Sequence, residues 1–435
     1  MNYTELLKNR SFQFHWLSGF IAQTGSFFSF VAMPWLILGI TNNNPLIMAT
    51  VMATASLPQA FFILFGGVLS DRLSPLKILF ISRLSLVVVI LSFASLIYIN
   101  AISLWMLYAY AFSTGLLGAI AIPASQALLP SILKSSHLAI ANGVVMGSMQ
   151  IAQILGPIAA GWIIWLAKTA RGVAENQTDT IAIAIAFSID ALGIFVAFLL
   201  MFFINPQRVY SKKENIMLML KQGLSFCWRD KGISTVLFYL ALVSFFLHGV
   251  LMATLPIFIK INLGLGEQAY GSLYATVGIG AIIGITIGVI TKPSAKYLSM
   301  LVLTCDLINA VALIGLGKSL DFSSAALCLL FMGVCGGIVM IAGTTWFQQR
   351  TPDYLMGRVM GILMFSIIGL MPLSATIAGI LITHYPVTLI MKASGSIIFT
   401  FVVIGFLIPR VRYMGDFPIV DELLPLASVK ELHTS

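Results

Sequence analysis

The sequence predicts an all-α integral membrane protein with twelve transmembrane helices in two pseudo-symmetric bundles of six. Composition predicts this class, because 59% of the 435 residues are hydrophobic and 9% are charged, against about one quarter charged in an average soluble domain. The apolar residues also come in blocks of roughly 20 or more. Each block is long enough to cross about 30 Å of hydrocarbon as a helix.

The twelve blocks are separated by turn-forming stretches such as TNNNP at 41–45, LSPLK at 73–77 and TKPSAK at 291–296. Proline, glycine and small polar residues in such clusters end helices. In chain order, we expect spans over 14–40, 46–69, 76–99, 102–127, 138–167, 180–204, 232–260, 268–291, 297–317, 322–348, 356–383 and 388–409.

The longest polar stretch between apolar blocks, 205–231, divides the spans into two sets of six. We therefore expect an N-terminal bundle over 1–204, a cytosolic linker over 205–231 and a C-terminal bundle over 232–409. A polar cytosolic tail over 410–435 completes the predicted organisation.

Basic residues predict the orientation in the membrane. With both termini placed in the cytosol, 19 of the 24 lysines and arginines fall on the inner side. The other five fall on the outer side: Lys168, Arg171, Lys260, Lys318 and Lys392. Cytosolic segments carry this excess of positive charge in multi-pass proteins. The net charge of +9 is thereby explained without nucleic acid, which we do not expect as a partner.

Charged residues interrupt the apolar sequence between spans 2 and 3, in GGVLSDRLSPLKILF. Gly67 allows a close helix approach, and Asp71 at a helix end can accept hydrogen bonds from Arg72, Arg83 or a facing helix N-terminus. We interpret these residues as a conformational gate on the inner side. The alternative is a solvated turn that only fixes topology.

The two halves repeat this pattern. Lys292 follows Gly288 as Asp71 follows Gly67, and Asp306 stands in span 9 where Arg83 stands in span 3. We expect Asp306 to pair with Lys292 or another basic group. The inner turns QALLPSILKSSHLAIANG at 126–143 and QQRTPDYLMGRVMG at 348–361 also match in style, and the second adds Gly357 and Arg358 to the gate residues. Repeated six-span units are typical of transporters with a central site.

Small residues predict where the halves touch. Gly156-Pro157 breaks the hydrogen-bond ladder of span 5, and span 8 carries Gly280-x3-Gly284-x3-Gly288. Small faces allow helices to pack closely in membranes. We expect spans 5 and 8 to pack on each other through these faces, as one of the surfaces about which the halves rock.

Ionisable residues within apolar spans are costly and therefore mark function by default. Asp190 lies near the middle of span 6 and His248 in the middle of span 7. Both groups can exchange protons, so they are candidates for proton coupling. The alternative is that each is a hydrogen-bonded interior group that serves packing.

Polar and aromatic residues on otherwise apolar spans are candidates for a substrate cavity. An apolar wall with few polar groups suits an amphiphilic ligand. These candidates are Gln23, Trp35, Gln59, Gln126, Gln150, Gln153, Tyr274 and Trp346.

Other functional classes lack their signatures. GLGKS at 315–319 ends like a phosphate-binding loop, but Ala312 replaces the first glycine and the segment closes a span. The sequence has no HExxH motif and no close acidic pair within a span, so we do not expect an enzyme. The four cysteines form no CxxC pair, so we interpret them as small packing residues and expect no metal site. We expect no cofactor, membrane lipid as surroundings, and a monomer.

Five segments in order resemble the major facilitator superfamily, in the drug-efflux branch that contains macrolide exporters and the enterobactin exporter. They are NRSFQFHWLSGFIAQTGSFFSFVAMPWLIL, GVLSDRLSPLK, PASQALLPSILKSSHLAIANG, GVVMGSMQIAQILGPIAAG and QQRTPDYLMGRVMGI. The resemblance covers nearly all of residues 9–409. The chain departs from it at Ser26 and Ala111, where relatives often carry an acid and an arginine tied to proton coupling.

The resemblance implies a secondary active transporter of a bacterial inner membrane. It would export a small amphiphilic molecule, such as a drug or a siderophore, by alternating access driven by the proton gradient. Two alternatives remain on the sequence alone: a flippase for lysophospholipid or another lipid, and a membrane sensor of the same fold that transports nothing.

Overall fold

The structure is a computed structural model of the chain. It describes residues 6, 8–72, 74–133, 137–174, 178–206, 216–291, 297–352 and 355–414. For residues 60, 61, 63–72, 139, 216–220 and 357 it describes the backbone only.

The described chain is built from helices in the following order. They are α2 (Arg10–Ile40), α3 (Pro45–Arg72), α4 (Pro75–Tyr98), α5 (Leu104–Ile132), α6 (Leu138–Ala170), α7 (Thr180–Leu200), η2 (Met201–Phe203), α8 (Ile216–Arg229), α9 (Lys231–Ser244), η3 (Phe245–Gly249), α10 (Val250–Ile257), η4 (Phe258–Asn262), α11 (Glu267–Thr291), α12 (Leu298–Leu316), α13 (Phe322–Arg350), α14 (Met356–Ile368), α15 (Met371–Ile382), α16 (Val387–Leu407) and α17 (Pro409–Arg412).

These helices confirm the predicted all-α membrane fold. Over the described residues, eleven helical segments are long and apolar enough to cross a membrane. The 28-residue helix α3 stands where the sequence predicts the remaining span. Only helices and closed barrels satisfy every backbone hydrogen bond in hydrocarbon, so a chain with this many apolar blocks folds into a helical bundle.

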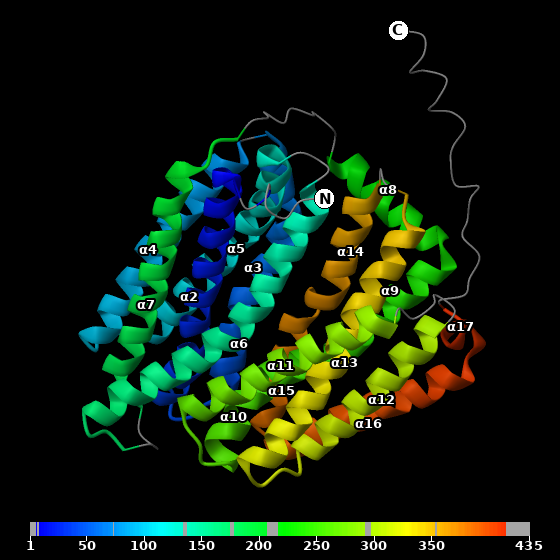
Figure 1. Cartoon of the computed structure of the whole chain (residues 1–435). Coiled ribbons are helices and arrows are strands. Elements are labelled where there is room, and N and C mark those ends of the chain that lie inside the picture. The colour runs from blue at the N-terminus through cyan, green and yellow to red at the C-terminus, as the bar shows by residue number, and fades with distance from the viewer. Residues whose placement is uncertain are drawn as a thin grey trace.

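The helices form two bundles of six spans (Figure 1). In the N-terminal bundle, α2 packs against α6 and α7, α3 against α5, and α4 against α7. In the C-terminal bundle, α11 packs against α13, and α12 against α13 and α16. We call the end of the bundles at which α8 lies the linker end. The opposite end, which holds the turns at 41–44, 99–103, 263–266, 317–321 and 383–386, we call the far end.

The small residues of span 8 face a different helix from the one predicted. A Cβ on Gly284 would lie 2.0 Å from the Val334 carbonyl oxygen of α13, and a Cβ on Gly280 would lie 2.3 Å from that of Leu330. The expectation that Gly280, Gly284 and Gly288 pack on span 5 is therefore wrong. The periodicity of the glycines identifies a close contact, but helix rotation decides which neighbour receives it.

Two spans of the C-terminal bundle are irregular. Span 7 contains wide π-helical turns, η3 and η4, at either end of α10. Span 11 is interrupted at Gly369, between α14 and α15. Side chains fix the irregular parts to each other, since the Ser244 hydroxyl donates to the Ile367 carbonyl and the Ser374 hydroxyl donates to that of Phe245. Turns of this kind are frequent at functional sites.

The linker contains helix α8, which the sequence analysis treats only as a polar stretch. α8 packs against α9 and α14, and its Cys227 is buried. Burial, with the nearby Asp230 carboxylate, raises the pKa of the Cys227 thiol to about 12. Helix α8 of the linker is therefore packed on the C-terminal bundle.

The glycine contact between α11 and α13 gives a stability prediction. We expect Gly284→Ala to lower the apparent midpoint of thermal unfolding of the purified protein. The added methyl would meet backbone 2.0 Å away, and overpacking of this kind costs about 1–3 kcal/mol.

The matched control is Gly336→Ala on α13, where a Cβ meets no heavy atom within 4 Å in the part of the chain that the structure describes. It should leave the midpoint unchanged or raise it, because alanine favours a helix over glycine by about 1 kcal/mol. Equal loss in both variants would contradict the contact.

Candidate functional site

The two bundles meet at the far end, where α6 crosses α11. A Cβ on Gly271 would lie 2.1 Å from the Pro157 carbonyl oxygen, and one on Gly161 would lie 2.7 Å from the Glu267 carbonyl oxygen. The backbones touch because no side chain intervenes, as small residues permit. This confirms that spans 5 and 8 pack on each other, through Pro157 as predicted but through other glycines of span 8. Gly156 instead faces Phe27 of α2.

The same face of α6 is uncovered toward the linker end. Gly147, Ile154 and Gly161 follow one another at intervals of seven residues and so share a helix face. Ile154 contacts the position of Gly278 on α11, whereas a Cβ on Gly147 or Gly143 meets no heavy atom of the described residues within 4 Å. The ribbons of the two bundles diverge in this direction (Figure 1). The described contacts between α6 and α11 therefore gather toward the far end.

A second contact between the bundles closes the far end on the other side. Helix α15 packs against α3, and a Cβ on Gly379 would lie 2.1 Å from the Ala49 Cβ. Ala49, Ala375 and Ala378 are fully or almost fully buried here. Two close helix pairs, α6 with α11 and α3 with α15, thus join the bundles at the far end.

Aromatic side chains fill the middle of the closure. Phe30 of α2 packs against Tyr274 of α11, with ring centroids 4.8 Å apart, and the Trp35 ring centroid lies 5.2 Å from that of Tyr270. Phe27 completes the group at 6.4 Å from Tyr274. Aromatic pairs at these separations stabilise a contact beyond the area they bury. The cluster forms the end wall of the space between the bundles.

A buried ion pair joins the bundles beside this cluster. The Lys168 ammonium of α6 lies 3.5 Å from the Glu267 carboxylate of α11, and the two side chains are 3% and 2% exposed. Sequence analysis counts Lys168 only as an outer-side charge and does not single out Glu267. The sequence does carry a signal for this pair. Spans 5 and 8 are predicted neighbours, and Lys168 and Glu267 lie at the same predicted end of these two spans.

Asp190 lies inside the N-terminal bundle, away from the closure. Its Oδ2 accepts a hydrogen bond from the Ser29 hydroxyl of α2, and the residue is 2% exposed. Gly25 leaves room for the carboxyl group, because a Cβ there would lie 3.3 Å from Oδ1. Among the described residues, Oδ1 has no hydrogen-bond partner. Nothing in the sequence alone singles out Ser29 and Gly25 as the neighbours of the Asp190 carboxyl group.

The other coupling candidate, His248, lies in the π-helical turn η3. Its side chain is exposed, and its Nδ1 lies 3.4 Å from the Ser244 hydroxyl. Asp190 and His248 thus belong to different bundles, and no contact brings them together.

The cavity candidates divide by exposure. Gln126 is exposed, and Gln23, Gln59, Gln150, Gln153 and Tyr274 are half-buried. Trp35 and Trp346 are 2% and 4% exposed. Trp35 belongs to the aromatic cluster. Trp346 lies under the Arg350 guanidinium, whose centre is 5.2 Å from its ring, so it lies in the interior of the C-terminal bundle.

The gate candidates are in part outside the described side chains. Lys292 lies outside the described residues, and Gly67, Asp71, Arg72 and Gly357 have only their backbone described. Arg83 and Arg358 bond to residues of other helices, and Asp306 bonds within its own helix. Arg83 donates to the Ser18 hydroxyl, Arg358 donates to the Gln222 side chain, and Asp306 accepts from Asn309 Nδ2 at 3.2 Å.

Asn309 is thus a described partner of Asp306, and the expected pairing of Asp306 with Lys292 lies outside the described residues. A buried ion pair does occur at the linker end, between Arg350 Nε and Asp230 Oδ2 at 2.8 Å. Asp230 also accepts from the Ile233 backbone N–H at the start of α9. This pair fixes the end of α13 to the beginning of span 7.

Comparisons with known proteins agree with this architecture. The model of the Major Facilitator Superfamily matches residues 16–376. The enterobactin exporter EntS of Shigella boydii serotype 4 is 22% identical over 370 residues, which is 83% of each chain. That of Salmonella paratyphi A is 23% identical over 366 residues, again 83% of each chain.

Solved structures show the same fold. A bacterial homolog to the human lysosomal transporter Spinster, in an inward-facing and occupied conformation, aligns with a TM-score of 0.68 at 13% identity, over 95% of this chain and 96% of that one. The D-xylose-proton symporter aligns with a TM-score of 0.67 at 13% identity, over 92% and 97%. With the family model matched over most of its length, the chain is a membrane transporter that belongs to the major facilitator superfamily.

Proposed function

We propose that the chain is a proton-coupled secondary transporter that exports a small amphiphilic molecule, such as a drug or a siderophore, by alternating access. We place it in a bacterial inner membrane with the linker end and both termini in the cytosol. Similarity to the enterobactin exporters supports export. The excess of basic residues at the predicted inner side supports the orientation.

The observation that carries alternating access is the unequal cover of one helix face. α6 contacts α11 through Ile154 and Gly161, yet leaves Gly147 and Gly143 open. Two rigid helices that touch at one end and separate at the other can exchange these ends by tilting. The structure then corresponds to the state open to the cytosol.

Lys168 and Glu267 act in this proposal as the lock of the far end. A buried charge left without its partner is strongly unfavourable. Opening the far end carries α6 away from α11 and lets water reach both groups, so the pair favours the present state without forbidding the other.

Breaking this lock should shift the conformational equilibrium. We expect Glu267→Gln to lower the rate at which a maleimide labels Gly147→Cys, in a background whose four native cysteines are replaced. The equilibrium between the two states should move by about fivefold or more, as for a loss of roughly 1 kcal/mol. The labelling rate in membrane vesicles measures this shift.

The charge-exchanged double variant Lys168→Glu with Glu267→Lys is the control, because it restores an ion pair of reversed polarity. It should recover most of the labelling rate. Unchanged labelling in Glu267→Gln would remove the pair from the gate.

Asp190 carries the coupling proton in this proposal. Its carboxyl group is buried among membrane helices, bonded to Ser29, and its Oδ1 lacks a partner among the described residues. A carboxyl group in such a place is buried at least cost as the neutral acid. A movement of α2 that separates Ser29 from Asp190 and admits water would release the proton.

Asp190→Asn should therefore uncouple transport from the proton gradient. We expect the variant to lose uphill export of a responsive compound from a panel of macrolides, dyes and the native siderophore. It should keep exchange of labelled for unlabelled compound across proteoliposomes, because asparagine can keep the Ser29 hydrogen bond but cannot release a proton.

Asp179→Asn, at the start of the same helix, is the matched control. Asp179 caps α7 and pairs with Arg171 at 3.0 Å, and asparagine also caps helices well. This variant should keep uphill export. Uphill export that persists in Asp190→Asn would exclude Asp190, and ligand binding without any exchange in the unmodified protein would favour a sensor.

A further inference from the structure

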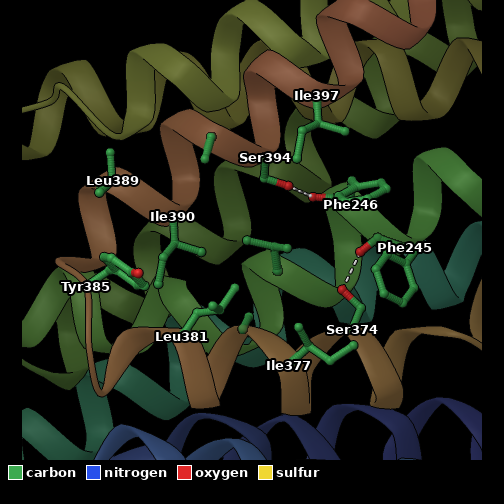
Figure 2. Close-up of a pocket in the computed structure, with 13 residues that line it drawn as sticks. Phe245, Phe246, Ser374, Ile377, Leu381, Tyr385, Leu389, Ile390, Ser394 and Ile397 are labelled. Carbon is green, nitrogen blue, oxygen red and sulfur yellow. Dashed lines mark hydrogen bonds between the residues drawn. The ribbon is translucent and has the colours of Figure 1, made fainter.

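An apolar groove runs along the C-terminal bundle, outside the space between the bundles (Figure 2). Its volume is about 350 Å³, within the range of small-molecule sites. Ile377 and Leu381 of α15 form one wall, and Leu389 and Ile397 of α16 form the other. The floor comes from span 7, at the π-helical turn η3 and the start of α10.

The groove opens away from the protein. Each wall helix buries its other face: Gly379 of α15 meets Ala49 of α3, and Gly395 of α16 meets Ala310 of α12. The wall residues are 38–47% exposed, and they belong to membrane-spanning helices. The medium in front of them is therefore bilayer hydrocarbon.

The two serine hydroxyl groups in the groove are already used as donors. Ser374 donates to the Phe245 carbonyl and Ser394 to the Phe246 carbonyl, as Figure 2 shows. Both carbonyls belong to the π-helical turn η3, and each accepts one of these serine hydroxyls. The groove therefore presents carbon to its occupant and has little to offer a polar ligand.

The length of the groove matches one leaflet. Tyr385 lies at the far-end mouth, in the turn before α16, and Ile397 lies near the middle of α16. The ten helical steps from Val387 to Ile397 rise by roughly 15 Å along α16, and half of a hydrocarbon core is also roughly 15 Å thick. Tyr385 is 53% exposed, and tyrosine is enriched at headgroup level.

We propose that this groove binds one acyl chain of a membrane lipid from the far-end leaflet. The headgroup lies beside Tyr385, and the chain terminus lies near Ile397 and the η3 turn. The site is separate from the proposed transport path, which runs between the bundles, and it does not depend on the direction of transport.

A photo-crosslinking lipid tests this site. The full-length protein is reconstituted in phosphatidylcholine vesicles that contain a small fraction of phosphatidylcholine with a diazirine on one acyl chain. A diazirine near the chain terminus should label the region of Ser394–Ile397, and one near the headgroup should label Tyr385–Leu389. Peptide mass spectrometry locates the label. Labelling spread evenly over the outward faces of all spans, or independent of diazirine depth, would overturn the proposal.

Filling the groove should remove the label. Ala393 lines the groove and is exposed, so Ala393→Phe places a ring where the chain lies. We expect groove labelling to fall by about fivefold, as for a loss of roughly 1 kcal/mol of affinity. Ile377→Trp, on the opposite wall, should act likewise and serves if the first variant is poorly folded.

Ser396→Phe is the matched control, since Ser396 is exposed on the same helix and lies outside the groove lining. It should leave groove labelling unchanged. A second outcome would also overturn the proposal. In it, lysophosphatidylcholine that carries a diazirine labels the groove preferentially, and an excess of diacyl lipid does not displace this label. The groove would then be a site for a single-chain amphiphile.

Discussion

Helix α6 meets helix α11 where neither backbone carries a side chain in the way, and the relation between the two bundles depends on this contact. The Pro157 carbonyl faces Gly271, and Gly161 faces the first turn of α11. In a membrane, helices gain little from burying apolar surface against each other, so close backbone packing supplies much of their attraction. Any methyl group at this crossing would hold the bundles apart. The aromatic cluster and the Lys168–Glu267 pair are placed by the same crossing.

Three sets of buried ionisable groups in this chain differ in where their partners lie. Lys168 and Glu267 pair across the two bundles. Asp230 and Arg350 lie within one bundle and hold α9 to α13, so they move as a unit. Asp190 has a hydroxyl partner, Ser29, and an oxygen without a described partner. In the proposed function, this incompletely bonded carboxyl group is the one that carries the coupling proton.

Irregular helices shape the C-terminal bundle. The wide turn η3 in span 7 and the interruption at Gly369 in span 11 would each leave backbone carbonyls unsatisfied in hydrocarbon, which is costly. Ser244, Ser374 and Ser394 satisfy them from neighbouring helices. The outcome is a span that bends without exposing polar backbone. The same arrangement leaves a carbon-lined groove between α15 and α16.

The sequence by itself determined the class of the protein, the number and limits of its spans and the pairing of spans 5 and 8. These follow from apolar length and from the position of breakers, which are properties of local sequence. Only the tertiary structure decided that Gly280 and Gly284 face α13, that Asp306 bonds Asn309, and that Glu267 meets Lys168. The reason is rotational. A helix in hydrocarbon can turn any small face toward any neighbour at little cost, so contacts between distant spans are fixed by the packing of all twelve together.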